Sequence, residues 1–224
     1  MNRKRLRKWS VLLGALALAG AGCSPSSLGW LLKDTHTKPE YPLPPREGKK
    51  EIVVLVMASK SANLAADPMF ATVDGELAGL VNRTLTMETK DAKHPMRCIE
   101  QSKLQSFKTS SRSDWRTMSP VTIGTELGAD YVIDLNITSM TIFSKELARE
   151  YCQGRASVDI SVYDTAQPDK ILQQFPHHSM QQEKSTLSMP PEHYRRWFTE
   201  RLARELAWRH IPHDSNERLA ASAK

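Results

Sequence analysis

Alternating and continuous hydrophobic segments along the chain predict a β-sheet. Residues 51–57 (EIVVLVM) form a continuous, largely β-branched run, which is typical of a central strand covered on both faces. In residues 131–138 and 155–162 apolar and polar side chains alternate, which predicts two strands with one buried face each and favours an antiparallel pair. Residues 96–100 and 171–175 are expected to add shorter strands. The pattern therefore predicts a mixed sheet of about five strands.

Amphipathic helices are predicted between and after these strands. Apolar positions recur every three or four residues in residues 70–85, and residues 121–127 form a shorter helical segment. An Asp-Pro or a Ser-Pro pair, suited to a helix start, precedes each of them. A final helix is expected over residues 191–210. The order β-α-β-α-β-β-β-α predicts a single α/β (α+β) domain of three or two layers over residues 51–212, with a disordered tail at 213–224.

The N-terminal residues 1–22 have the layout of a secretory signal peptide. Five basic residues lie in the first eight positions, residues 11–19 are apolar, and the small residues 20–22 lead to Cys23. The apolar run is too short for a permanent transmembrane helix, which needs about 20 residues. The proline-rich residues 23–50 are expected to form a tether between Cys23 and the domain.

The small residues that run directly into Cys23 resemble the lipobox of bacterial lipoproteins. This resemblance implies cleavage before Cys23, a diacylglycerol on its thiol and acylation, commonly with palmitate, of the new amino group. The family prefers Leu three residues before the cysteine, whereas this chain has Gly20. Ser24 rather than Asp follows the cysteine, which by the sorting rule of enteric lipoproteins implies the periplasmic face of the outer membrane. The alternative is a secreted protein in which Cys23 has no such role.

The positive charge of the chain is concentrated in the signal-like residues. The formal net charge of +6 falls to +1 once the five basic residues of residues 1–22 are removed. A nearly neutral protein lacks the general electrostatic attraction on which nucleic-acid binding depends. We therefore expect no nucleic-acid partner.

The chain lacks the sequence motifs of common catalytic and cofactor sites. It has no phosphate-binding loop, no G-x-S-x-G, no H-E-x-x-H and no dinucleotide-binding fingerprint. The pairs His177-His178 and His210–His213 have no cysteine or carboxylate at a diagnostic ligand spacing. The sequence therefore predicts neither a metal site nor a cofactor.

Two cysteines, Cys98 and Cys152, lie in the predicted domain. An even number of thiols in an oxidising compartment allows a disulfide between them. The alternative is two buried free thiols, because cysteine often serves as a small buried hydrophobe. The sequence neighbours of Cys152 provide no base that would make it a catalytic nucleophile.

Residues 123–133 (IGTELGADYVI) place a short helix that ends in Gly-Ala-Asp directly before a strand. This phrase resembles the periplasmic α/β domains of the curli-secretion-channel lipoprotein type, whose architecture the Pel polysaccharide-export lipoprotein shares. Residues 154–164 (GRASVDISVYD) fit the same resemblance, which covers roughly residues 50–210. It implies an α/β fold and ring-forming relatives. The chain lacks the long amphipathic hairpin with which channel-forming members build a barrel, so pore activity is not expected.

The final predicted helix has two distinct sides. The apolar positions expected to face the sheet are Tyr194, Phe198, Leu202 and Leu206. At one margin of this side lie Trp197, Arg201, Arg204 and Trp208. Tryptophan and arginine are enriched in protein–protein hot spots, so this margin predicts a surface for self-association or for a partner. The alternative is that both indoles complete the core, with the arginine stems lying over them.

These features favour a non-enzymatic protein. The prediction is a membrane-anchored periplasmic lipoprotein that acts as an interaction or assembly module of an envelope or export complex. Its expected partners are the membrane, through the lipid, and an envelope protein or a second copy of the chain. The alternative is a lipid-tethered periplasmic hydrolase or small-ligand-binding protein, which would need a converging set of polar catalytic residues that the sequence does not display.

Overall fold

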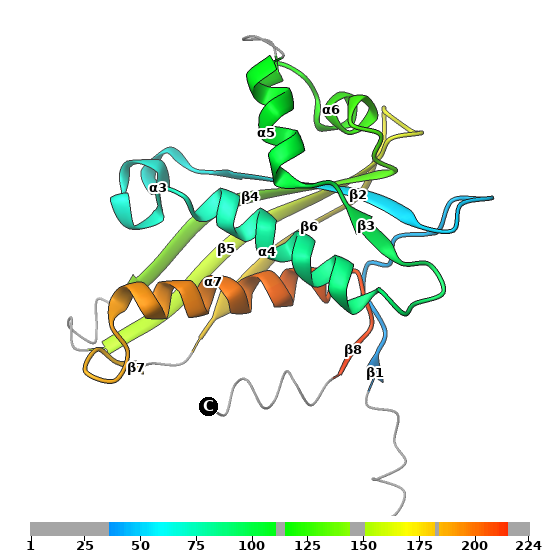
Figure 1. The fold of residues 1–224 in the computed structure, drawn as a ribbon. Helices are drawn as coiled ribbons and strands as arrows, with labels where there is room; N and C mark the ends of the chain where they lie inside the picture. Colours follow the sequence, from blue (N-terminus) through cyan, green and yellow to red (C-terminus); the bar gives the residue numbers. More distant parts are fainter. Residues whose placement is uncertain (1–35, 111–114, 144–150, 182–183, 215–224) are drawn as a thin grey trace, which may run out of the picture. The chain divides into compact units, whose positions relative to one another are not determined.

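A mixed β-sheet forms the centre of the domain (Figure 1). The computed structural model describes residues 36–110, 115–143, 151–181 and 184–214. The main strands are β2 (Ile52–Lys60), β3 (Met96–Cys98), β4 (Tyr131–Phe143), β5 (Tyr151–Asp164) and β6 (Ile171–Met180). They follow the order β3-β2-β4-β5-β6, and the short β7 (Lys184–Ser185) pairs with β5. The predicted single α+β domain with a mixed sheet of about five strands is therefore confirmed.

Strand β2 runs parallel to both of its neighbours, whereas β4, β5 and β6 are antiparallel. Val54 of β2 lies opposite Cys98 on one side and Tyr131 on the other. In the antiparallel part, Leu135 of β4 lies opposite Ile160 of β5, and both are buried. Because directly opposite residues share a face, the apolar positions of the two alternating segments meet on one side of the sheet, as predicted.

Helices α4 (Val73–Glu88) and α7 (Pro191–Ala207) cover this side of the sheet (Figure 1). They run parallel to each other, because Glu76 of α4 bonds to Arg195 while Glu88 bonds to Trp208. The four positions predicted to face the sheet are buried: Tyr194, Phe198, Leu202 and Leu206. The packing side of α7 is therefore as its spacing predicted.

Two shorter helices, α5 (Gln101–Ser110) and α6 (Pro120–Glu126), cover the parallel part of the opposite face. A second hydrophobic cluster joins them to the sheet: Val53, Leu55, Ile99, Leu104, Ile123, Ala129 and Val132. Gly128, with a φ of 75°, takes the left-handed conformation that ends α6 before β4. The antiparallel part of this face is polar, and Asn136 and Asp159 are exposed there. The remaining short elements are β1 (His36–Thr37), α3 (Ala62–Ala66), the 3-10 helix η1 (Pro68–Phe70) and β8 (His213–Asp214).

The structure differs from the predicted elements in three main places. His213 and Asp214, predicted to begin a disordered tail, form β8, which pairs with β1; the rest of the predicted tail, residues 215–224, lies outside the described residues. Strand β6 continues through Pro176 to Met180, whereas the predicted strand ended at residue 175. Proline is tolerated there because β6 is an edge strand, which needs ladder hydrogen bonds on one side only. Helix α5 was not predicted, because its only buried side chain is Leu104, so the segment carries little apolar periodicity.

Candidate functional site

Residues 40–49, part of the predicted tether, pack against the domain and are called here the docked segment. The ring of Tyr41 stacks on Phe175 of β6, with the ring centroids 3.8 Å apart. The backbone N–H of Tyr41 donates to the carbonyl oxygen of Arg209 over 2.7 Å. Leu43 is buried in the main core. The tether expected over residues 23–50 is therefore corrected at its end, because these contacts, together with the pairing of β1 with β8, join the chain to the domain from Thr37 onward. Residues 23–35 lie outside the described residues.

The backbone of the docked segment is also bound by a neutral histidine. The Nδ1 atom of His210 lies 2.8 Å from the carbonyl oxygen of Tyr41. Burial lowers the pKa of His210 to about 4, and this effect outweighs the hydrogen bond to Tyr41, which raises the pKa. The imidazole is therefore uncharged at neutral pH, with its Nδ1–H donating to Tyr41.

Buried carboxylates hold the other end of the docked segment. Arg46 forms an ion pair with Asp164, and its guanidinium also donates to the carbonyl oxygen of Asp130 over 3.1 Å. Lys49 pairs with the buried carboxylate of Asp130, which accepts the backbone N–H of Val53 over 2.9 Å as well. The two carboxylates are largely removed from water, whereas the Lys49 side chain is half exposed. Loss of the basic partners would therefore leave a buried negative charge uncompensated. The docked segment is thus an integral part of the domain surface.

Asp130 is the acid of the Gly-Ala-Asp segment that follows α6, and no role was predicted for it. Its partners lie 77 to 84 residues away along the chain, so no local pattern could reveal them. One signal for the docked segment was present: Tyr41 and Leu43 are apolar within an otherwise polar, proline-rich stretch. Two such residues two positions apart are typical of a chain that lies along a surface with one side buried.

A polar cluster lies between β6 and the C-terminal half of α7. Its centre is the carboxylate of Glu205, which accepts from Ser179 Oγ and Gln181 Nε2, each at 2.9 Å. Arg201 Nε donates to it over 3.1 Å, and His177 Nε2 lies 3.4 Å away. Burial alone would raise the pKa of Glu205, but the contact with His177, the hydrogen bond from Ser179 and the neighbouring positive charges lower it. Both oxygens of the buried Glu205 carboxylate therefore accept hydrogen bonds, whereas His177 Nε2 has no hydrogen-bond partner among the described residues.

The cavity beside this cluster is small. It has a volume of about 70 Å³, and it is lined by Thr37, Lys38, Glu40, Glu205, Trp208, Arg209 and His213. Each water molecule occupies about 30 Å³ in the liquid, so about two waters fit. The cavity is therefore smaller than the roughly 300–1,000 Å³ that is typical of pockets for drug-sized ligands.

One pair of residues has the geometry of a nucleophile and a base. Ser157 Oγ lies 3.0 Å from His178 Nδ1, across the β5–β6 pair. Both belong to the open polar side of the sheet, where Asp159 and Pro176 are the next opposed pair. Cross-strand pairs of this kind are ordinary surface contacts, and a flat sheet face does not enclose a substrate.

The predicted interface on α7 is corrected by the structure. Trp208 is 3% exposed, and its indole Nε1–H donates to Glu88 over 3.0 Å. Arg201 is buried too, with its guanidinium 5.8 Å from the centre of the Trp208 ring. Trp197 is half-buried against Tyr194, and only Arg204 is exposed. The core alternative therefore describes Trp208, which packs at the C-terminal end of α4 and does not face solvent.

The disulfide that the sequence left open is not formed. Cys98 and Cys152 are both free, because β2 and β4 separate the strands that carry them. Neighbouring strands are about 4.8 Å apart, so three spacings far exceed the Cα separation that a disulfide allows. Burial raises the pKa of Cys98 to about 11 and also raises that of Cys152, so both remain protonated thiols. Cys23 lies outside the described residues.

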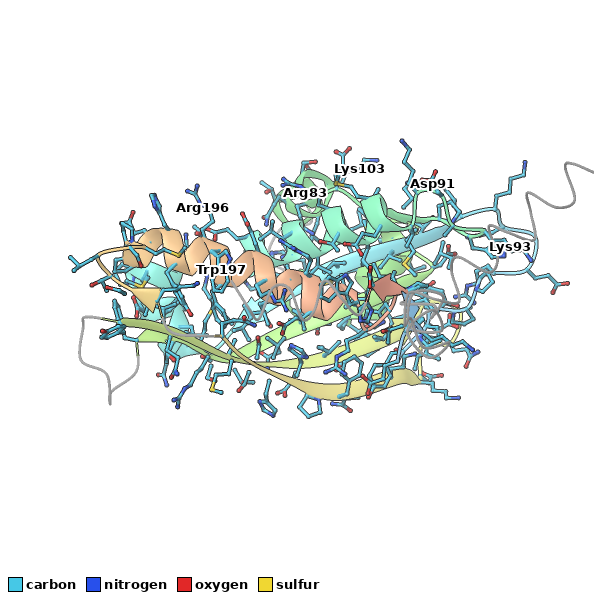
Figure 2. All side chains as sticks on the ribbon, turned by 90° about the horizontal axis from the view of Figure 1, so that it is seen from below. Arg83, Asp91, Lys93, Lys103, Arg196 and Trp197 are labelled. Atoms are coloured by element: carbon cyan, nitrogen blue, oxygen red, sulfur yellow. The ribbon has the colours of Figure 1, made fainter. Side chains whose placement is uncertain are left out.

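A larger groove lies between α4 and α7 on their outer side. It has a volume of about 380 Å³, and it is lined by Gly75, Glu76, Gly79, Leu80, Arg83, Arg195, Arg196, Thr199 and Glu200. Arg195 bridges the two helices through a 2.6 Å ion pair with Glu76. The hydrogen bond from Arg195 holds the pKa of Glu76 below its usual range, although burial acts in the opposite direction. This open groove is the candidate interaction site, and Figure 2 shows Arg83 and Arg196 on its outer side.

The described residues contain neither a metal-ligand cluster nor a membrane-spanning helix. Within the described ranges, no group of three or more His, Cys, Asp or Glu side chains is arranged to hold a metal ion. None of the helices in the same ranges combines the length and hydrophobicity that a membrane crossing requires.

Comparison with known proteins gives low similarity only. No family model and no curated protein matches the chain. The solved structure of the hypothetical protein CT253 from Chlamydia trachomatis is 19% identical with a TM-score of 0.42, over 72% of this chain and 95% of that one. The PelC dodecamer from Paraburkholderia phytofirmans is 11% identical with a TM-score of 0.43, over 79% and 96%. Lipoprotein GNA1162 from Neisseria meningitidis is 13% identical with a TM-score of 0.41, over 70% and 98%. Similarities this low carry no inference about function.

Proposed function

We propose that the chain is a lipoprotein anchored through Cys23 on the periplasmic face of the outer membrane, with its domain serving as a non-enzymatic interaction or assembly module of an envelope complex. The observation that carries the proposal is the signal-like segment ending at Cys23, followed only 17 residues later by the docked segment. An acyl anchor holds a protein at a membrane without a spanning helix, because each buried methylene contributes about 0.8 kcal/mol. The short connection would keep the domain near the bilayer.

Several features of the domain favour interaction over catalysis. The cavity beside Glu205 has room for about two waters, whereas the groove between α4 and α7 is open and bordered by arginines. The raised pKa values keep Cys98 and Cys152 protonated, which argues against thiolate chemistry. A surface groove with a few polar groups suits a protein partner better than an enclosed small substrate.

The anchor is tested by Cys23→Ser in the full chain, with Cys98→Ser as the matched control. Labelling with radioactive palmitate and membrane fractionation are expected to show loss of label and release, or lack of processing, for Cys23→Ser only. Ser24→Asp is expected to keep the label but to move the protein to the inner-membrane fraction of a sucrose gradient. A Cys23→Ser protein that keeps its label, or a wild type that never takes any, overturns the lipid anchor. A Ser24→Asp protein that stays in place overturns the outer-membrane assignment alone.

A further inference from the structure

The outer face of α4 carries an unusual set of side chains for a solvent-facing helix. Gly75, Gly79, Arg83 and Met87 follow one another at four-residue spacing, so they form one ridge along the helix. Met87 is 67% exposed, and the neighbouring Leu80 is half-buried. The ridge therefore offers two small positions, one charge and one apolar side chain, and Leu80 adds a second apolar side chain beside it.

The two glycines are not explained by packing inside the domain. A Cβ atom added at Gly75 or at Gly79 would have no heavy atom within 4 Å. Both lie inside a helix, where glycine is less favourable than alanine, and neither takes a positive φ. Because these two positions have no side chains, the helix backbone of α4 is accessible along this wall of the groove. A backbone from outside the domain could approach α4 closely there.

The charges along the groove favour an acidic occupant. Arg83 and Arg196 are exposed and form no ion pair within the part of the chain that the structure describes. Figure 2 places both on the outer side of the helix layer. Arg195 is neutralised by Glu76, which leaves Glu200 as the remaining acid among the groove residues. Two free guanidinium groups against one carboxylate favour carboxylates on the partner, with bidentate geometry available to each arginine.

We propose that the groove between α4 and α7 is the docking site of an acidic, amphipathic α-helix from another envelope protein. The proposal rests on the function proposed above, since it names the partner chemistry of that interaction module. Two neighbouring parallel helices form a trough in which a third helix packs at an axis distance of about 8–10 Å. The glycines admit the partner backbone, Leu80 and Met87 contact its apolar side, and Arg83 and Arg196 pair with its carboxylates.

The test is site-specific crosslinking in cells that produce the full-length protein. Met87 is replaced by the photoreactive residue p-benzoylphenylalanine, and adducts are mapped by mass spectrometry. The expected adduct is an acidic helical segment of one envelope protein. Its yield is expected to fall at least tenfold in Gly79→Leu and in the pair Arg83→Glu with Arg196→Glu. Asn136→Glu, on the polar sheet face, is the matched control and should leave the yield unchanged. Replacing the partner's acidic residues by lysine should restore the adduct of the double arginine variant.

Other outcomes reject the docking site. An adduct with a second copy of the chain, an adduct with a basic or non-helical segment, no adduct, or equal yields in all variants each overturn the proposal. Thermal melts accompany every variant, and unchanged or raised melting temperatures are expected, since the changed positions are open. Membrane fractionation in parallel separates the two proposals. A groove variant that stays in the membrane fraction but loses its adduct supports the docking site. A wild type that stays in the membrane fraction but forms no adduct overturns the docking site and leaves the lipid anchor intact.

Discussion

The same chemical change, glycine to alanine, is expected to have opposite effects at two positions of this domain. At Gly154 on β5, an added Cβ would lie 2.5 Å from a ring carbon of Phe198, which is completely buried in α7. The backbone N–H of Gly154 also donates to the Tyr194 hydroxyl over 2.8 Å. Helix α7 therefore rests directly on the strand backbone here. At Gly79 the added Cβ would meet no atom within 4 Å.

The magnitudes follow from these distances. Overpacking a closed core costs about 1–3 kcal/mol, and the stiffer unfolded chain of an alanine variant returns about 0.4–1 kcal/mol. Gly154→Ala should therefore lower the free energy of unfolding by about 0.5–2.5 kcal/mol. Gly79→Ala should raise it by up to about 1 kcal/mol, because alanine is the better helix former. For a domain of this size 1 kcal/mol corresponds to about 2–4 °C in Tm.

Thermal denaturation of the detergent-solubilised protein, followed by circular dichroism, measures both variants under one condition. The expected result is a lower Tm for Gly154→Ala and a raised Tm for Gly79→Ala. Equal upward shifts would refute the contact between Phe198 and the β5 backbone. A lowered Tm for Gly79→Ala would show that the groove is closed by protein atoms, which would also remove the space that the partner helix needs.

Three further outcomes are expected. Trp208→Ala should lower the free energy of unfolding in urea by about 3–5 kcal/mol, as for other buried aromatic residues. Arg204→Glu should change it by less than about 0.5 kcal/mol, and equal effects of the two variants would contradict the burial of Trp208. The folded pKa of His210, about 4, lies below the unfolded value near 6.5, so the unfolded chain binds the proton first. Stability should therefore fall by up to about 3 kcal/mol as the pH drops from 6.5 to 4, and His210→Asn should lack this part of the pH dependence. Asp130→Ala should cost about 1–3 kcal/mol, because it leaves the buried Val53 N–H without its acceptor, and it should expose the bonds after Arg46 and Lys49 to trypsin. Lys49→Ala should cost less than about 1 kcal/mol, and a trypsin-resistant Asp130→Ala protein would contradict the docked segment.

The strand faces and the packing side of α7 could be predicted because they depend on local periodicity. Leu135 and Val158 are buried as their alternation predicts, and Asn136 and Asp159 are exposed. A period of two leaves a strand with only two choices of face, and the apolar set decides between them. The same argument applies to α7, where the three- and four-residue spacing selects one side.

The candidate site could not be predicted in this way, because its contacts join distant parts of the chain. Tryptophan is a residue type enriched in interaction hot spots, but Trp208 is buried and donates a hydrogen bond to Glu88, which lies 120 residues earlier in the chain. The groove requires α4 and α7 to lie side by side and parallel, which no spacing within either helix reveals. The docked segment lacks regular periodicity, and its position depends on carboxylates at the ends of β4 and β5.

The docked segment also limits where a lipid-anchored domain could act. Because β1 pairs with β8 and residues 40–49 are docked, only the chain between Cys23 and Thr37 remains to span the distance from the bilayer. Its 14 residue steps extend at most about 50 Å. Arg46 forms ion pairs with two largely buried carboxylates, so salt screens these pairs less than exposed ones. The docked segment should therefore stay bound, and its release should not lengthen the connection between Cys23 and the domain. The groove begins near Arg195, about 20 Å along α7 from Trp208, beside which the chain enters the domain. A partner helix that docks there must therefore come from an envelope protein that places it within about 70 Å of the membrane carrying the anchor.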